Sequence, residues 1–208
     1  MTKSDWLAAL EIRHGKALQE RFSAVSVAVC GLGGLGSNVA ISLARAGIGR
    51  LHLIDFDRVD ISNLHRQQYG VSQLGMYKTE AMRQILYEIN PYCKVVTDTV
   101  RLNEENLSLI AECGIVCECF DNAECKAMLV NGVTERYPEK HIVAASGMSG
   151  LHTGNTIQTK RLGRRLYICG DGMSDVSDDG TLFAPRVMLC AAHQANTVLR
   201  IIAGEFEV

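Results

Sequence analysis

The chain has 208 residues, 47% hydrophobic and 21% charged, and 21 Lys and Arg against 23 Asp and Glu give a net charge of −2. This balance provides no basic excess to attract nucleic acid, and no apolar run reaches the roughly 18–20 residues of a membrane-spanning helix, so neither partner is expected. The length predicts one domain over 1–208 with a full core, and the polar N-terminus, unlike a secretory signal, favours a cytoplasmic protein.

Helical and strand-like patterns alternate along the chain. A helix is expected first over about 4–22, capped by Ser4, with an apolar stripe that includes Leu7 and Phe22. Further helices are expected over 35–46, 78–89, 104–112, 123–136 and 189–202, strands over 25–30, 51–55, 93–100, 114–120 and 141–145, and a polar hairpin over 151–168. This order predicts an α/β, Rossmann-like fold with a mostly parallel sheet, helices on both faces and an antiparallel extension near the C-terminus.

A glycine-rich loop follows the first predicted strand and opens the next helix. Gly31, Gly33 and Gly36 match G-x-G-x-x-G, a pattern that permits a tight turn, a close phosphate and close helix–strand packing. A phosphate would sit at the helix N-terminus, where unpaired N–H groups favour an anion. Asp55 ends the next predicted strand, the place of a ribose-binding acid. The motif predicts a nucleotide rather than an unliganded turn, but it does not separate a dinucleotide from ATP.

A polar loop after the second predicted strand favours ATP. Asp57, Ser62 and Asn63 precede Arg66, and Lys78 begins the next predicted helix. A lone cation is usually a solvated surface charge, but these residues leave the same end of the sheet as the glycine loop. Cations grouped there suit a triphosphate, which carries more charge than a pyrophosphate diester.

Asp121 and Asn122 lie where the predicted strand over 114–120 ends. An Asp at the carboxyl end of a strand, near phosphates, is a candidate magnesium ligand. The same residue would also serve as the N-cap of the helix over 123–136, because Asp and Asn both cap well. The residue pattern by itself leaves both interpretations open.

These motifs, in their order and spacing, resemble a known family. They are GLGGLGS at 31–37, LIDFDRVDISNLHRQ at 53–67, GMYK at 75–78, INP at 89–91 and the Asp121-Asn122 pair. Over about residues 10–203 the chain is similar to the ThiF/MoeB/HesA family of sulfur-carrier adenylyltransferases, which are related to ubiquitin-activating enzymes. RHG at 13–15, APR at 184–186 and CAAHQAN at 190–196 most resemble short ThiF-like proteins.

The resemblance implies a homodimer that uses ATP and magnesium to adenylate the C-terminal glycine of a small ubiquitin-like, ThiS-like sulfur carrier protein. Thiamine thiazole synthesis is the expected pathway. The carrier carboxylate would attack the α-phosphate, an acyl-adenylate would form and pyrophosphate would leave. That carboxylate is already ionised at pH 7, so the site needs cations rather than a general base.

The resemblance also assigns roles to individual residues. Arg66, Lys78 and Asp121 would be catalytic, and Asp121 would hold magnesium. Arg13 would reach the partner's ATP site across the dimer, and Arg186 is an alternative anion contact. The nucleotide would be contacted by Gly31, Gly33, Gly34, Gly36, Asp55, Asp57, Ser62, Asn63, Arg66, Lys78 and Asn122.

The cysteines set the chain apart from larger relatives. Many of these carry two C-x-x-C pairs for zinc, whereas the eight cysteines here form none, so no zinc is expected. Cys169 has polar, Gly-rich neighbours and is the candidate for an exposed sulfur carrier, although an idle loop cysteine is favoured. Cys190 and His193 share one face of an apolar helix, where packing is the better interpretation.

Two functions of other classes remain open. A nicotinamide-dependent oxidoreductase would explain the glycine loop and Asp55, but it would leave Arg66, Lys78 and Asp121 without a purpose. A non-catalytic nucleotide- or partner-binding module would suit a short chain that lacks a complete carrier-docking surface. Titration with ATP and NAD distinguishes the oxidoreductase from an adenylyltransferase. Pyrophosphate exchange with a carrier distinguishes the non-catalytic module from an adenylyltransferase.

Overall fold

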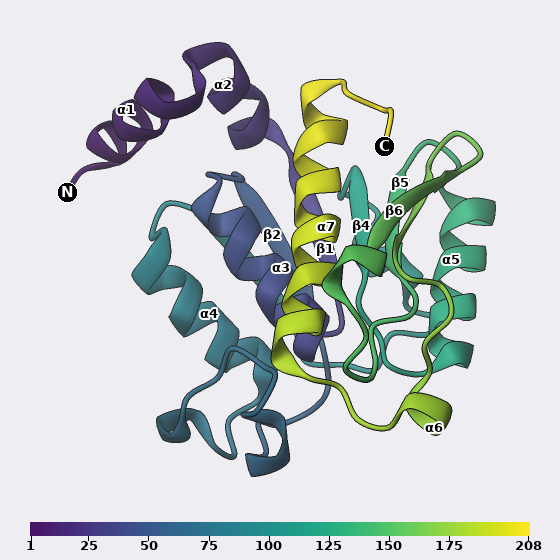
Figure 1. Cartoon of the computed structure of the whole chain (residues 1–208). Coiled ribbons are helices and arrows are strands. Elements are labelled where there is room, and N and C mark those ends of the chain that lie inside the picture. Colours follow the sequence, from purple (N-terminus) through teal and green to yellow (C-terminus); the bar gives the residue numbers. More distant parts are fainter.

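A seven-stranded sheet forms the centre of the molecule (Figure 1). The computed structural model describes the whole chain, residues 1–208. The strands are β1 (Ser26–Cys30), β2 (Arg50–Ile54), β3 (Lys94–Asp98), β4 (Ile115–Glu118), β5 (His141–Ala145), β6 (Gln158–Leu162) and β7 (Leu166–Gly170). Their order is β3-β2-β1-β4-β5-β7-β6, and all neighbours are parallel except β6 and β7. The predicted sheet with its antiparallel extension is confirmed.

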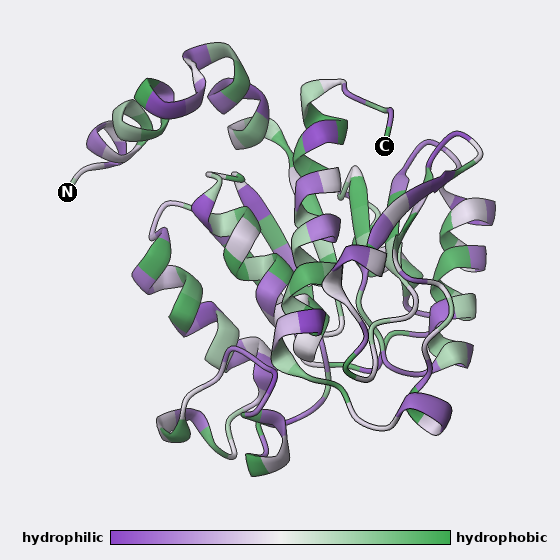
Figure 2. Ribbon diagram, in the orientation of Figure 1, coloured by the Kyte–Doolittle hydropathy of each residue, from purple (hydrophilic) through white to green (hydrophobic).

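Helices cover both faces of this sheet. They are α1 (Lys3–His14), α2 (Lys16–Ala24), α3 (Gly34–Arg45), α4 (Lys78–Ile89), α5 (Ala123–Arg136), α6 (Val176–Asp179) and α7 (Ala184–Ala203). Val27 and Val29 of β1 join the core beneath α3, α4 and α7, whereas Ala28 and Cys30 join the core beneath α5. Burial on both faces explains the continuous apolar run of this strand. In Figure 2, β4 has hydrophobic colours, whereas the edge strand β6 is largely hydrophilic.

The strand order reverses at β1. From β1 the chain runs outward to β2 and β3, and it then returns to place β4 on the other side of β1. The loops that leave the carboxyl ends of β1 and β4 therefore diverge, and open α/β sheets bind ligands in the crevice between such loops. This topology places the glycine loop and the Asp121-Asn122 pair on two sides of one crevice.

The N-terminal segment differs from the single helix predicted over 4–22. It forms two helices, α1 and α2, which are separated at Gly15, where a φ of +89° lies in the left-handed region. The predicted cap Ser4 is wrong, because Thr2 caps α1 through a reciprocal capping box with Asp5. α1 buries no residue, and Figure 1 shows it projecting from the body of the molecule.

Three further segments differ from the expected elements. The helix predicted over 104–112 is only a 3-10 turn at Leu107–Ile110, and the short helix α6 was not predicted. α7 begins at Ala184 rather than at 189, because Pro185 fits its first turn, where a missing N–H group removes no helical hydrogen bond. None of the helices combines the length and the apolar character needed to span a membrane.

Candidate functional site

The glycine loop follows β1 in a conformation that side chains would disrupt. Gly31 has a φ of +91°, and a Cβ atom on it would lie 2.8 Å from the carbonyl oxygen of Cys119. A Cβ atom on Gly36 would lie 1.8 Å from the carbonyl oxygen of Gly31, so α3 approaches the loop only because no side chain intervenes. A Cβ atom on Gly33 would meet nothing closer than the Gln67 side-chain nitrogen at 3.8 Å. The loop therefore leaves open backbone at Gly33, where a phosphate can approach.

Asp55 follows β2 and braces the glycine loop. Its carboxylate accepts the backbone N–H groups of Leu32 at 2.6 Å and Asp57 at 2.8 Å. The Tyr69 hydroxyl donates to the Leu32 carbonyl at 2.8 Å, which holds the loop from the other side. Burial raises the pKa of Asp55 above its ordinary value, and the nearby Lys78 ammonium opposes that shift. Asp55 nevertheless lines the crevice, where a ribose hydroxyl can donate to it.

Lys78, the first residue of α4, forms an ion pair with Asp57. The ammonium nitrogen lies 2.8 Å from the carboxylate oxygen, and the two side chains are 7% and 48% exposed respectively. Both residues line the crevice. The buried ammonium is therefore held in place, while its partner is half open to solvent. A phosphate oxygen entering the crevice can share this ammonium with Asp57.

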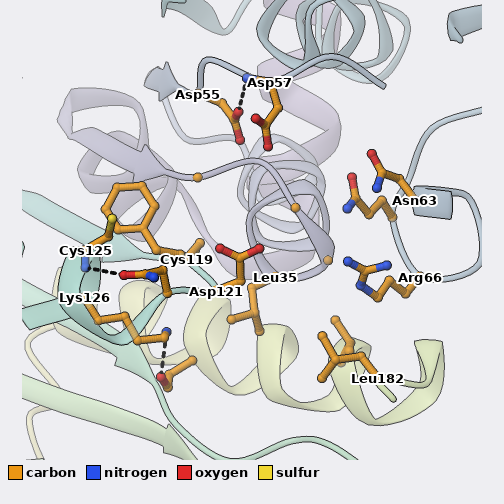
Figure 3. A pocket seen from close by; sticks show the side chains of 18 of the residues that line it. Leu35, Asp55, Asp57, Asn63, Arg66, Cys119, Asp121, Cys125, Lys126 and Leu182 are labelled. Atoms are coloured by element: carbon orange, nitrogen blue, oxygen red, sulfur yellow. Dashed lines mark hydrogen bonds between the residues drawn. The ribbon is translucent and has the colours of Figure 1, made fainter. Parts of the chain in front are cut away.

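The polar loop over 57–67 brings three of its four predicted contacts into the crevice, and Asp57 is one of them. Asn63 and Arg66 line it, and Figure 3 shows both side chains across the crevice from Asp121. The Nε atom of Arg66 is buried without a hydrogen-bond partner. Ser62 does not line the crevice, because its hydroxyl donates to the Asp60 carboxylate at 2.6 Å. Arg66 Nη1 donates to the Ser62 carbonyl at 3.2 Å, and its Nη2 atom makes no hydrogen bond, so the guanidinium can still bind an anion, whereas Ser62 uses its hydroxyl locally.

Arg13 does not reach the crevice of its own chain. It is an exposed residue of α1. This helix lies at the end of the sheet where the strands begin, whereas the crevice lies at the end where they finish (Figure 1). The following helix α2 is held there, because the Phe22 carbonyl accepts the N–H group of Gly49 at 3.0 Å just before β2. Any contact between Arg13 and a nucleotide site would have to involve the site of another copy.

Asp121 is exposed, lines the crevice and has no hydrogen-bond or ion-pair partner in the chain. The next residue, Asn122, caps α5, since its side chain accepts the N–H group of Cys125 at 3.0 Å. The interpretation of Asp121 as the helix cap is therefore wrong. Figure 3 shows the Asp121 carboxylate pointing into the crevice, on the side of Asp55 and Asp57. A free carboxylate beside a phosphate-binding loop fits a magnesium ion.

An ion pair between the buried Glu118 and the crevice-lining Lys126 was missed by the sequence-based prediction. Lys126 of α5 donates to the Glu118 carboxylate at 2.9 Å and to the Ala145 carbonyl at 3.0 Å. The same carboxylate accepts the N–H group of Phe120 at 2.7 Å, which fixes the backbone that leads to Asp121. Burial raises the pKa of Glu118, and the Lys126 ammonium opposes the shift. The only signal in the sequence is a Glu within the apolar run GIVCECF.

Two loops that follow β5 and β7 form the far side of the crevice, and we call them the loop wall (residues 145–153 and 171–183). Residues 145–149, 174–176 and 182 of these loops line the crevice. The crevice as a whole encloses about 630 Å³, within the range of small-molecule and cofactor sites. No residue of the loop wall was predicted to belong to the site, because no recognisable motif marks these loops.

Arg186 and Cys169 are buried, contrary to expectation. Arg186 is 4% exposed and its guanidinium lies 2.6 Å from the Asp171 carboxylate, so it is not an anion contact in the crevice. Cys169 lies fully buried on β7, and burial raises the pKa of its thiol. It is therefore neither an exposed sulfur carrier nor a loop cysteine. Cys190 is also fully buried, which agrees with the packing role expected for its helical face.

The sequence was compared with those of known proteins and matches one family. Residues 7–208 match the model of the ThiF family. The chain is 33% identical over 193 residues to the molybdopterin-synthase adenylyltransferase of Escherichia coli strain K12, which covers 89% of this chain and 76% of that protein. It is also 33% identical over 195 residues to the adenylyltransferase and sulfurtransferase UBA4 of Candida glabrata. That match covers 90% of this chain but 45% of UBA4, so the chain spans less than half of this relative.

Solved structures share the fold. The E. coli tRNA N6-threonylcarbamoyladenosine dehydratase TcdA, solved in complex with ATP, matches with a TM-score of 0.86 and 21% sequence identity over 98% of this chain and 97% of that chain. E. coli MccB matches with a TM-score of 0.70 and 23% identity over 90% of this chain and 59% of that chain. At these identities the likeness establishes a common fold.

Proposed function

The chain belongs to the ThiF family, and from this premise we propose that it is an ATP-dependent adenylyltransferase acting on a small ubiquitin-like sulfur carrier protein. The names of the relatives at 33% identity support the reaction class. The observation that carries the proposal is Asp121, a carboxylate without a protein partner that faces the glycine-loop side of the crevice. A hydride-transfer site would have no use for this carboxylate beside Arg66 and Lys78.

ATP would lie along the crevice with its phosphates at the glycine loop. The open backbone at Gly33 and the start of α3 at Gly34 would offer N–H groups to phosphate oxygens. Asp55 would accept a ribose hydroxyl. The apolar side chains of Phe56 and Leu102, which line the crevice beside β2 and β3, would flank the base. This placement leaves the loop wall for the second substrate.

Adenylation joins a carboxylate oxygen of the carrier to the α-phosphorus and breaks the bond to the β-phosphate oxygen, so that pyrophosphate leaves. Arg66 and Lys78 would offset the charge that develops on the phosphates, and Asn63 and Asn122 would donate hydrogen bonds nearby. Asp121 would hold magnesium, which supplies further charge neutralisation at the phosphates. The nucleophile is ionised at neutral pH, so the chain needs no Ser, His or Lys general base.

The nucleotide preference is tested by titration calorimetry with Mg-ATP and with NAD. We expect Mg-ATP to bind at least tenfold more tightly, because Arg66, Lys78 and Asp121 serve a triphosphate and have no task in a dinucleotide site. The Arg66→Met variant should lose most of this preference while keeping its melting temperature. Tight NAD binding together with no ATP binding would return the chain to the oxidoreductase class.

The identity of the carrier is the finer part of the proposal. The short ThiF-like motifs favour a ThiS-like carrier and thiamine thiazole synthesis, whereas the E. coli relative is named for molybdopterin synthase. ATP–pyrophosphate exchange with a purified ThiS-like protein and with the small subunit of molybdopterin synthase distinguishes the two. Exchange with only the second protein would move the chain to the molybdopterin pathway, and exchange with neither would favour a non-catalytic module.

A homodimer would allow Arg13 to act on the ATP site of a partner copy. Arg13→Ala and Asp121→Ala homodimers should both be inactive in pyrophosphate exchange. Mixed dimers of the two variants should recover part of the activity, because one of their two sites then has both side chains. If dimers shown to have exchanged subunits recover no activity, Arg13 does not act across an interface.

A further inference from the structure

Hydrogen bonds between its two loops hold the loop wall together. The N–H groups of Asp171 and Gly172 donate to the carbonyls of Gly147 at 2.9 Å and Ser146 at 3.0 Å. A third backbone bond joins Gly150 to the Thr181 carbonyl at 3.0 Å. These bonds tie residues 146–150 to residues 171–181, although neither loop contains a helix or strand long enough to stiffen it. The wall therefore depends on tertiary contacts for its shape.

The Arg186 side chain adds hydrogen bonds to both loops of the loop wall. It lies in the first turn of α7, 4% exposed, and its Nη2 atom donates to Asp171 at 2.6 Å. Its Nη1 atom donates to the carbonyls of His152 and Thr153, both at 2.8 Å, and its Nε atom donates to the Met148 carbonyl at 3.4 Å. One planar guanidinium thus fixes three points of the first loop and one of the second.

Asp171 connects Arg186 by hydrogen bonds to residues that line the crevice. Its second carboxylate oxygen accepts the N–H groups of Met173 at 2.9 Å and Ser174 at 2.8 Å. The Ser174 hydroxyl in turn accepts the N–H group of Ser149 at 3.1 Å. A Cβ atom on Gly147 would lie 2.0 Å from the Asp171 carboxylate, so this arrangement also requires a glycine opposite it. Ser149 and Ser174 line the crevice, whereas Asp171 and Arg186 stay behind it.

Stability by itself does not explain a buried arginine here. Removing a guanidinium and a carboxylate from water costs free energy, and well-packed apolar side chains often stabilise a buried position equally well. An arginine with four backbone and carboxylate contacts instead determines geometry, because each of its donors has a direction. The geometry that it determines is that of the crevice surface opposite the glycine loop.

We propose that Arg186 and Asp171 are positioning residues that shape the loop wall to receive the C-terminal peptide of the carrier. This inference rests on the proposed function. The lining residues of the first loop, 145–149, are small except for Met148 and leave room for an extended, unbranched peptide end. Arg186 acts on this peptide through the loop wall and touches neither the peptide nor the nucleotide.

The test separates carrier affinity from nucleotide affinity. KM for a purified ThiS-like protein ending in Gly-Gly is measured by ATP–pyrophosphate exchange, and Kd for Mg-ATP is measured by calorimetry. Arg186→Met should raise the carrier KM by about tenfold or more, because displaced binding groups lose alignment with the substrate. Its Kd for Mg-ATP should stay within about twofold of wild type. Arg186→Lys, which keeps the charge but not the fork of donors, should lie between wild type and Arg186→Met.

Two further variants keep the test decisive. Arg200→Met removes an arginine of the same helix whose contact, to the Glu207 carbonyl, is outside the crevice, and it should change neither constant. If Arg186→Met does not fold, Asp171→Asn keeps the shape of the side chain, loses its charge and should raise the carrier KM several-fold. An unchanged carrier KM in a folded variant, or an equal loss of ATP affinity, would overturn the positioning role. If the wild-type protein showed no exchange with a ThiS-like protein or with the small subunit of molybdopterin synthase, the proposed function would be overturned instead.

Discussion

The two sides of the crevice use their polar groups in opposite ways. Among the residues expected to bind the nucleotide, 31–36, 55–67, 78 and 121–122, the backbone at Gly33 is open, and Asp121 and the Nε atom of Arg66 have no partners in the chain. In the loop wall, Asp171 pairs with Arg186 of α7 at 2.6 Å, and His152 pairs with Asp179 at 2.7 Å. The first set leaves these polar groups free for a ligand, whereas in the loop wall these side chains hold the loops in shape, although the buried Ser149 hydroxyl there also has no partner.

Asp121 provides the most severe test of this contrast. Asp121→Asn keeps the shape of the side chain but removes the charge that a hard divalent cation prefers. We expect ATP–pyrophosphate exchange to fall on the order of 10²-fold or more, as for other lost electrostatic contacts to a transition state. The melting temperature without nucleotide should not change, because Asp121 has no partner in the folded chain. Equal activity of mutant and wild type at low magnesium would remove Asp121 from the site.

The neighbouring residue is the matched control for that experiment. Asn122→Ala removes the side chain that caps α5 and should cost about 1 kcal/mol of stability. For a chain of this size, differential scanning calorimetry should show a fall in melting temperature of roughly 2–4 °C. Asn122→Asp, which retains a capping oxygen, should restore it. If Asp121→Asn also lowered the melting temperature by this amount, the assignment of the cap to Asn122 would be contradicted.

Two glycines sharpen the contrast within the glycine-loop side. Gly36→Ala would place a Cβ atom 1.8 Å from the Gly31 carbonyl oxygen, and this overpacking should cost about 1–3 kcal/mol or more in stability. Gly33→Ala meets no atom closer than 3.8 Å and should leave urea-induced unfolding unchanged, yet it should weaken Mg-ATP binding several-fold by obstructing the phosphate. The reverse pattern would mean that Gly33 supports the fold and that Gly36 contacts the ligand.

Cysteine labelling is expected to give the smallest effect. Cys125 is partly exposed and lines the crevice, whereas the other seven cysteines are buried. Burial raises the pKa of thiols such as Cys119 and Cys190, so these contain less reactive thiolate at pH 8 than ordinary cysteines. At pH 8, mass spectrometry should show that iodoacetamide modifies Cys125 first and that Mg-ATP slows this a few-fold. If Cys125 were labelled equally fast with and without Mg-ATP, the nucleotide would not bind in this crevice.

Local signals explain which parts of the structure were predictable. α4 over 78–89 and α5 over 123–136 have the predicted bounds, because Pro91 and Asn122 mark their ends within a few residues. The glycine loop and Asp55 were found for the same reason, since their spacing is a local property of one strand–turn–helix unit. The break at Gly15 was missed, because an apolar stripe continues across it on both sides.

The contacts of the loop wall and of the Glu118–Lys126 pair are not encoded within one local segment of the sequence. Arg186 meets Asp171 and Lys126 meets Glu118 only after the sheet has brought separate loops and helices together. In the sequence, Arg186, Asp171 and Lys126 are indistinguishable from solvated surface charges, and only Glu118 stands out, because it lies within an apolar run. Arg186 was therefore interpreted as an anion contact, although its guanidinium is already saturated. Motifs predicted most of the residues that line the glycine-loop part of the crevice, whereas no motif marked the loop wall.

The packing of α7 along α3 has a consequence for how the chain folds during synthesis. Val187 of α7 lines the crevice, and one of its methyl groups would lie 2.8 Å from a Cβ atom on Gly34 of α3, near the opposite end of the chain. Such contacts between distant segments form late, because a long intervening chain must be ordered first. A nascent chain that ends before residue 184 therefore exposes the apolar face of α3 and lacks Val187, which lines the crevice. If the crevice binds ATP as proposed, ATP would stabilise this protein only after α7 has left the ribosome.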